Sequence, residues 1–271
     1  MRGRVLIVAG SDSGGGAGIQ ADIKTISMLD GYAATAITAL TAQNTEGVFG
    51  VLPIPPEFIR RQIEVVLDDI GADVIKTGML HDAAVIEATV AVLQERAAAI
   101  PVVVDPVMVA KGGARLIDPA ALEALTQLLI PRAEIVTPNL PEAEILCGTA
   151  IGNVAEMQAA GETLLALGCR AVLVKGGHLP GETVSDVLVT AGGVRVWENP
   201  RITTRHTHGT GCTLASAIAA GLAQGLDVAS AVDRARNYVQ LAIASAPGLG
   251  HGHGPLDHAH PLHADRAASN C

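Results

Sequence analysis

The sequence predicts an α/β fold in which a mostly parallel sheet is covered by helices on both faces and ends in antiparallel strands. Short runs rich in β-branched residues are almost continuously apolar, as expected for strands buried on both faces. Between these runs, apolar residues recur at spacings of three and four, which is typical of amphipathic helices packed on a sheet. Two further apolar segments flank Gly192 and Gly193, which indicates a hairpin at the end of the sheet.

The elements follow one another in a regular order along the chain. Each predicted parallel strand is a run of four or five residues, and these runs are 5–9, 74–77, 102–105, 134–137 and 171–175. The predicted helices are 18–29, 57–67, 83–96, 119–129 and 154–167. The hairpin strands 184–189 and 194–197 come next, followed by a helical pattern over 214–224. Alternation of strands with helices is the signature of a doubly wound sheet.

Length and composition favour one domain. The chain has 271 residues, of which 49% are hydrophobic, so it can bury a sizeable core. Because no repeat or linker interrupts the alternation, we predict a single domain over residues 1–257. Residues 258–271 end a stretch rich in Gly, His and Pro that starts at Gly248, and they are predicted to form a flexible, solvated tail. Adventitious binding of a transition metal by its histidines is the alternative.

Charge and residue usage exclude several classes of partner. The chain has 27 acidic and 18 basic residues, a net charge of −9, and only 2% aromatic residues. These values argue against nucleic acid, which needs basic surfaces and stacking platforms. The first apolar run, 5–10, is too short for a signal peptide or a membrane span, so we expect a cytoplasmic protein without a membrane partner. The four cysteines are far apart, which fits neither a zinc site nor a disulfide framework.

Unusual residues follow several predicted strands, at the edge where ligands bind in open α/β sheets. The first such segment, GSDSGGGAG at 10–18, matches neither a Walker A loop nor a dinucleotide fingerprint. It is interpreted either as a tight turn in which Asp12 or Ser13 caps the next helix, or as a backbone surface that a small ligand approaches closely.

Three acidic or amide side chains follow later strands. Asp105, fixed before Pro106, is placed to hold a divalent metal or a metal-bound water, and a helix cap is the alternative. Asn139 and Glu142 lie three residues apart around Pro141, at a predicted helix start. A carboxylate there could hold Mg²⁺ or complement the helix dipole.

The segment THGTGCT at 207–213 is the strongest single signal. Gly209 and Gly211 open a helix, where unpaired backbone N–H groups form an anion site. Cys212 falls in the first turn, so we expect a lowered thiol pKa and a reactive thiolate rather than a small core residue. His208 is interpreted as a packed, hydrogen-bonded residue.

Seven segments together resemble one family. They are AGSDSGGGAGIQADIKT (9–25), ITALTAQNT (37–45), KTGML (76–80), DPVMVAKGG (105–113), TPNLPEAE (137–144), VKGGH (174–178) and THGTGCT (207–213). In this order they resemble the hydroxymethylpyrimidine/phosphomethylpyrimidine kinases of thiamine biosynthesis, within the ribokinase-like superfamily. The resemblance covers nearly the whole chain and implies a ribokinase-like fold.

The resemblance also implies an activity and a site. The activity is ATP-dependent phosphorylation of 4-amino-5-hydroxymethyl-2-methylpyrimidine, and then of its monophosphate to the diphosphate, with Mg²⁺ and in a homodimer. The pyrimidine would be held near Gly10, Asp22, Gln43, Met79 and Val107. Cys212 would be the base, with the backbone of Gly209, Thr210 and Gly211 stabilising the transferring phosphoryl group. Lys175, Asn139 and Thr210 would contact ATP, while Asp105 and Glu142 would hold Mg²⁺, directly or through water.

Other interpretations stay open at this point. Without the resemblance, Lys175 at the end of its strand could extend to the surface. Within enzymes, a pyridoxine/pyridoxal kinase is the main alternative, because those vitamins also carry a hydroxymethyl group on an aromatic nitrogen ring. A non-catalytic pyrimidine or nucleotide sensor on the same fold is the other, and it would be expected to have lost one of Lys175, Asp105, Glu142 or Cys212.

Overall fold

Within the part of the chain that the structure describes, nine strands form one sheet in the spatial order β3-β2-β1-β4-β5-β6-β7-β8-β9. The computed structural model describes residues 1–108 and 117–263. The strands are β1 (Arg4–Asp12), β2 (Tyr32–Gln43), β3 (Val48–Pro53), β4 (Val74–Thr77), β5 (Val102–Val104), β6 (Ile135–Val136), β7 (Ala171–Lys175), β8 (Thr183–Thr190) and β9 (Gly193–Pro200). Strands β2, β1, β4, β5, β6 and β7 pair parallel in this spatial order, whereas β3, β8 and β9 pair antiparallel. The predicted fold class is confirmed, and antiparallel strands occur at both edges.

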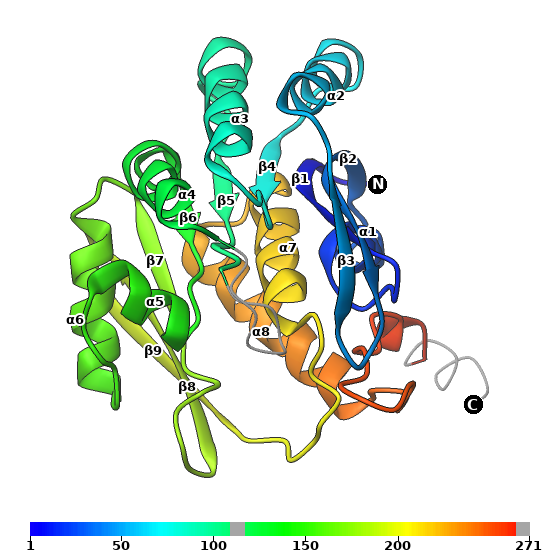
Figure 1. Ribbon diagram of the computed structural model, residues 1–271. Helices are drawn as coiled ribbons and strands as arrows, with labels where there is room; N and C mark the ends of the chain where they lie inside the picture. Colours follow the sequence, from blue (N-terminus) through cyan, green and yellow to red (C-terminus); the bar gives the residue numbers. More distant parts are fainter. Residues whose placement is uncertain (109–116, 264–271) are drawn as a thin grey trace.

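Helices cover both faces of this sheet (Figure 1). One face carries α1 (Gly18–Met28), α7 (Thr210–Ala223) and α8 (Val228–Ala244). The other carries α2 (Pro56–Asp69), α3 (Ala83–Arg96), α4 (Pro119–Ala124), α5 (Leu140–Cys147) and α6 (Val154–Leu165). Strand β1 shows why its sequence is apolar throughout: Val5 and Ile7 pack toward α7 and α8, whereas Leu6 and Val8 pack toward the opposite layer.

The predicted helix over 119–129 has the expected extent but not a uniform winding. After α4, residues Leu125–Leu129 form a π-helix, and a short 3₁₀ turn, Ile130–Arg132, follows. Pro131 cannot donate a backbone hydrogen bond, which is one reason why regular α-helix does not continue through this point. Among the described residues, no helix is long and apolar enough to cross a membrane.

The predicted tail boundary at residue 257 is contradicted by His258. Its side chain is 5% exposed, and its Nε2 lies 3.0 Å from the hydroxyl of Thr213 on α7. The backbone carbonyl of His258 also accepts a 2.6 Å hydrogen bond from Tyr238 on α8. These buried polar contacts attach the first part of the predicted tail to the domain. Residues 264–271 of that tail lie outside the described residues.

Burial of His258 predicts a specific loss of stability in acid. Burial lowers its pKa to about 4, with a smaller contribution from the charge of Lys24. Between the ordinary value and about 4, the unfolded chain binds a proton that the folded chain does not, so stability falls as the pH decreases through this window. We expect this residue alone to remove about 2 kcal/mol of unfolding free energy between pH 7 and pH 5.

The measurement is urea unfolding of the wild type and His258→Gln at both pH values. Glutamine can keep a hydrogen bond to Thr213 but does not titrate. The variant should lose about 2 kcal/mol less than the wild type on acidification. Equal losses in the two proteins would show that His258 is not the group responsible.

Candidate active site

A cavity of about 730 Å³ lies at the carboxyl ends of the parallel strands, next to the first turn of α7. It is bordered by the segments that follow β1, β4, β5 and β7, as expected for an open α/β sheet. The sequence-predicted residues that line it are Gly10, Gln43, Met79, Asp105, Val107, Asn139, Glu142, Lys175, Gly209, Thr210, Gly211 and Cys212. Side chains separated by up to two hundred positions in the chain therefore face one space.

Asp22 is the exception, because it is not among the residues that line the cavity, and its contact with the pyrimidine stays a prediction. Its side chain is fully buried beneath the cavity and does not line it. The carboxylate oxygens lie 3.0 and 2.9 Å from Nζ of Lys76, and one of them accepts a 2.7 Å hydrogen bond from Ser216. Asp22 falls on the face of α1 that packs against the sheet, where its charge balances a buried lysine.

The first turn of α7 begins at the glycines, as predicted, and anion binding at this turn stays a prediction. Gly209 precedes the helix with a φ of 82°, in the left-handed region. The hydroxyl of Thr210 donates a 2.8 Å hydrogen bond to the carbonyl of Thr207, which secures the turn. Gly211 allows Lys175 to approach closely, because a Cβ at this position would lie 3.2 Å from the lysine Nζ. The positive end of the helix and a lysine therefore face the same part of the cavity.

Gly209 is required by space as well as by conformation, since a Cβ there would lie 1.8 Å from the carbonyl oxygen of Gly16. The two glycine segments are in direct backbone contact.

We expect Gly209→Ala to reduce the unfolding free energy by about 2 kcal/mol or more, because left-handed strain and a backbone clash add. Thermal and urea unfolding would measure this, with Gly225→Ala as control: that glycine is also left-handed but has open space around it. Equal losses of unfolding free energy in Gly209→Ala and Gly225→Ala would mean that the contact with Gly16 does not contribute to stability.

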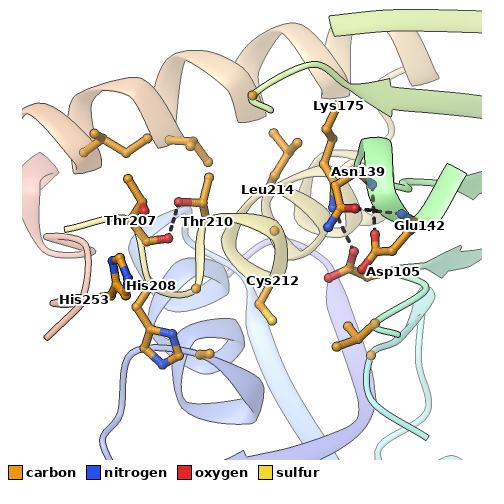
Figure 2. Close-up of a pocket in the computed structure, with 18 of the residues that line it drawn as sticks. Asp105, Asn139, Glu142, Lys175, Thr207, His208, Thr210, Cys212, Leu214 and His253 are labelled. Carbon is orange, nitrogen blue, oxygen red and sulfur yellow. Dashed lines mark hydrogen bonds and ion pairs between the residues drawn. The ribbon is translucent and has the colours of Figure 1, made fainter. Parts of the chain in front are cut away.

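Cys212 projects into the cavity below this turn (Figure 2). The expected low thiol pKa is wrong for the ligand-free protein, where burial raises the pKa of Cys212 to about 12. The charge of Lys76 and a hydrogen bond from the backbone N–H of Gly18 lower it, but the carboxylates of Asp22 and Asp105 raise it. The helix terminus alone does not overcome burial next to two acidic groups. Without ligands, the group is a thiol.

Lys175, Asp105 and Glu142 form a polar cluster opposite Cys212 (Figure 2). Lys175 Nζ lies 3.1 Å from an Asp105 oxygen, and the same oxygen is 3.2 Å from the hydroxyl of Thr137. The lysine side chain is 13% exposed, so it extends into the cavity and not to the molecular surface. Asp105 follows β5, and the described residues directly after it, 106–108, are not helical, so the alternative of a helix cap is wrong.

Glu142 and Asn139 have a structural role in addition to their place in the cavity. Asn139 accepts a 3.0 Å hydrogen bond from the backbone of Glu142, and Glu142 accepts a 2.8 Å bond from the backbone of Asn139. This reciprocal pair is a capping box at the start of α5. Burial raises the pKa of Glu142 to about 7; Lys175 opposes this effect and Asp105 adds to it. Two carboxylates close enough to disfavour each other's charge favour a bound cation.

The donor set fits Mg²⁺. Asp105 and Glu142 both present carboxylates to the cavity, and no group of three or more His, Cys, Asp or Glu residues with metal-binding geometry occurs in residues 1–108 and 117–263. Mg²⁺ is commonly held by one or two carboxylates, with water and substrate phosphates completing its coordination. A metal cage made entirely of protein ligands is therefore not required here.

Other residues of the lining supply apolar side chains and one amide. Met79 packs directly against Gly10, since a Cβ at Gly10 would lie 2.6 Å from the terminal methyl of Met79. Val107 lies on the same lining, while residues 109–113 of the predicted motif DPVMVAKGG lie outside the described residues. Nε2 of Gln43 is 3.3 Å from the ring of His208.

His208 is packed and hydrogen-bonded, as predicted. Its Nε2 lies 2.8 Å from a carboxylate oxygen of Asp12. Asp12 also accepts hydrogen bonds from the backbone N–H groups of Gly14, Gly16 and Ala17. The predicted cap of the next helix by Asp12 or Ser13 is wrong, because Ala17 precedes α1 and no side chain caps it. Asp12 instead shapes the glycine segment and connects it to the anion site.

A further part of the cavity was missed by sequence reasoning. It lies between β8, the segment after β9, and α8, and is lined by Val184, Asp186, Ile202, Arg236, Val239 and Ile243. Arg236 is ion-paired with Asp186 at 2.7 Å. The available signal was the helical spacing of Ala231, Val232, Ala235 and Val239, which would have identified α8 as a helix packed on the sheet.

The sheet order, the anion site and the facing lysine and carboxylates define a phosphotransferase of the ribokinase-like superfamily. The model of the phosphomethylpyrimidine kinase family matches residues 12–257. The chain belongs to the phosphomethylpyrimidine kinase family.

Individual relatives agree with this assignment. The chain is 46% identical over 256 residues to the hydroxymethylpyrimidine/phosphomethylpyrimidine kinase of Bacillus subtilis, covering 94% of each protein. It is 52% identical over 257 residues to the thiamine biosynthesis bifunctional protein ThiED of Geobacter sulfurreducens. That match covers 95% of this chain and 52% of the bifunctional protein, so this chain spans about half of its length.

Solved structures place two kinases close to this fold. The phosphomethylpyrimidine kinase of Clostridium difficile superposes with a TM-score of 0.79 at 44% identity, over 89% of this chain and 99% of that one. An ADP complex of Bacillus subtilis pyridoxal kinase superposes with a TM-score of 0.88 at 36% identity, over 97% and 99%. Sequence favours the pyrimidine kinases, while backbone shape is shared with a pyridoxal kinase.

Proposed function

We propose that this chain transfers phosphate from ATP to the hydroxymethyl group of 4-amino-5-hydroxymethyl-2-methylpyrimidine, and then a second phosphate to the resulting monophosphate. The observation that carries the proposal is the single cavity shared by the anion site, the Lys175–Asp105–Glu142 cluster and an acceptor region with Gln43, Met79 and Val107. Phosphoryl transfer needs positioning and charge neutralisation more than covalent chemistry, and this cavity supplies both.

Each side of the cavity has a distinct role in this proposal. Gln43 offers both a donor and an acceptor, which match a ring nitrogen and the adjacent amino group of the pyrimidine. Met79 and Val107 cover the ring. Cys212 accepts the proton of the substrate hydroxyl, while backbone N–H groups from Gly209 to Cys212 stabilise charge on the transferring phosphoryl group. Lys175 and Thr210 contact the phosphates of ATP, and Asn139 lies beside them.

A magnesium ion completes the charge balance. Asp105 and Glu142 are the residues that would hold it, directly or through water, and the ion would neutralise charge on the phosphates. Binding of ATP needs local positive charge, because the net charge of the chain is −9. Attraction of ATP must therefore come from the helix terminus, Lys175 and the ion.

Product analysis tests both transfers together. Mass spectrometry of the products formed from the hydroxymethylpyrimidine with ATP and Mg²⁺ should show the diphosphate, with the monophosphate as intermediate. Chelation of Mg²⁺ should stop both steps. Accumulation of the monophosphate alone would contradict the second transfer, and the absence of any phosphorylated pyrimidine would contradict the proposal.

Pyridoxal phosphorylation is the second candidate, favoured by the 0.88 TM-score with a pyridoxal kinase. Pyridoxal also presents a hydroxymethyl group on a flat nitrogen ring, so the same acceptor region could take it. Turnover of both compounds should be measured side by side. We expect the pyrimidine to react faster; a much faster reaction of pyridoxal, with no reaction of the pyrimidine monophosphate, would reverse the assignment.

A non-catalytic sensor is disfavoured because Lys175, Asp105, Glu142 and Cys212 are all present in one cavity.

We also infer that the chain forms a homodimer. The outer strand β3 carries large exposed apolar side chains, with Phe49 72% and Leu52 61% exposed. Exposed apolar residues on an edge strand favour pairing with another chain. Light scattering coupled to size-exclusion chromatography should give twice the mass of one chain, and a monomeric mass at micromolar concentration would contradict this inference.

A further inference from the structure

Lys76 is a buried cation that borders the candidate active site. The proposed reaction assigns it no role. It lies on β4, its side chain is 0% exposed, and it borders the same cavity as Cys212. A lysine is almost never buried to this degree without a partner. Both oxygens of Asp22 provide one, at 3.0 and 2.9 Å from Nζ.

The Lys76–Asp22 pair is connected to the helical turn that holds Cys212. Ser216 donates a 2.7 Å hydrogen bond to Asp22 and lies four residues after Cys212 on α7. Residues four apart share one face of a helix, so Cys212 and Ser216 both face toward α1 and the sheet. Gly78 packs closely against the ammonium, since a Cβ there would lie 3.0 Å from Lys76 Nζ.

The charges around the thiol have opposing effects. Burial by itself lowers the pKa of Lys76, but the neighbouring charge of Asp22 raises it above its ordinary value, so the lysine stays protonated. This positive charge lowers the pKa of Cys212, whereas Asp22 on α1 and Asp105 after β5 raise it. Lys175, at the end of β7, also interacts favourably with a charged Cys212. Lys76 is thus a fixed positive charge among the residues that border the cavity.

We propose that Lys76 is a positioning residue for Cys212, whose ammonium, held in place by Asp22 and Ser216, stabilises the thiolate form of the cysteine. In the transfer step, the thiolate takes the proton of the substrate hydroxyl, so an S–H bond forms as the O–H bond breaks. The hydroxyl oxygen bonds to the γ-phosphorus as the bond to the ADP oxygen breaks, and ADP leaves with that electron pair. The catalytic consequence rests on the proposed function, whereas the effect on the thiolate can be measured without substrates.

Opposite substitutions in the ion pair give a sharp test. The probe is iodoacetamide, applied to the ligand-free protein at one mildly alkaline pH, with alkylation of Cys212 followed by peptide mass spectrometry. Only the thiolate reacts, so its population sets the rate. Lys76→Met should slow alkylation of Cys212 about tenfold, the effect of one pKa unit, and Asp22→Asn should accelerate it by a similar factor. Alkylation of Cys147, which lies outside the cavity, should stay unchanged in the same samples.

A purely structural role would give a different pattern. Each single substitution breaks the same buried ion pair, so both should lower stability in the same direction. Opposite changes in alkylation therefore cannot result from loosening of the fold. Changes in the same direction, or no change in either variant, would overturn the proposal.

A double variant covers the case in which Lys76→Met does not fold. Lys76→Met/Asp22→Asn leaves no uncompensated charge, and its comparison with Asp22→Asn isolates the lysine. Alkylation of Cys212 should be about tenfold slower in the double variant than in Asp22→Asn, and equal rates would overturn the proposal. Because no ATP or pyrimidine is present, this result is independent of the product analysis that tests the reaction itself.

Discussion

Lys175→Met should reduce kcat/KM for ATP by about 10³-fold, the range found for loss of a charged group that stabilises a transferring phosphoryl group. Lys175 Nζ is held by Asp105 and lies next to the first turn of α7, so its charge is positioned before substrate binds. Steady-state kinetics with varied ATP would measure the effect. Because the net charge of the chain is −9, its surface charge does not replace the positive charge of Lys175.

Two controls make this result interpretable. Arg61→Met removes an exposed basic side chain outside the cavity and should change kcat/KM by less than about twofold. Unfolding of Lys175→Met must also be measured, because the substitution leaves Asp105 and Glu142 without their cation. A folded Lys175→Met protein with nearly normal kcat/KM would exclude the proposed contact with ATP.

Cys212→Ala should retain pyrimidine binding and lose about 10²-fold or more in kcat, the contribution typical of a general base. In the proposed function, pyrimidine binding depends on Gln43, Met79 and Val107, which line the cavity and which the substitution leaves in place. Isothermal titration with the pyrimidine and rapid-quench measurement of phosphoryl transfer would separate the two effects. The matched control is Cys147→Ala, which removes a half-buried thiol outside the cavity. Unchanged turnover in Cys212→Ala would leave positioning and charge alone as the source of catalysis.

The parallel strands could be predicted from sequence because burial on both faces leaves a continuous apolar run. Strand β4 and helix α3 have the predicted bounds, and the hairpin of β8 and β9 lies where Gly192 and Gly193 indicated it. Strands β2 and β3 were missed. β2 is rich in alanine and threonine, and β3 is largely exposed, so neither shows the apolar run of a central strand. Helix α8 was missed although its apolar spacing was available.

In the candidate site, too, some residues could be recognised from the sequence and others could not. Glycine-rich segments and polar residues at strand ends could be recognised locally, because an anion site and a metal site each require particular residue types at short spacing. The role of Asp22 could not be recognised in this way. Its neighbour Lys76 is 54 positions away, and only the packing of α1 on the sheet brings the two charges together.

The sequence by itself determined the α/β class, the family and twelve of the residues that line the cavity, because these depend on local patterns and on motif identity. The tertiary structure decided the electrostatics. The thiol pKa of Cys212, the partner of Asp22 and the buried state of His258 each depend on which distant side chains surround a group. Charge interactions and desolvation act through space, so residue spacing along the chain does not encode them.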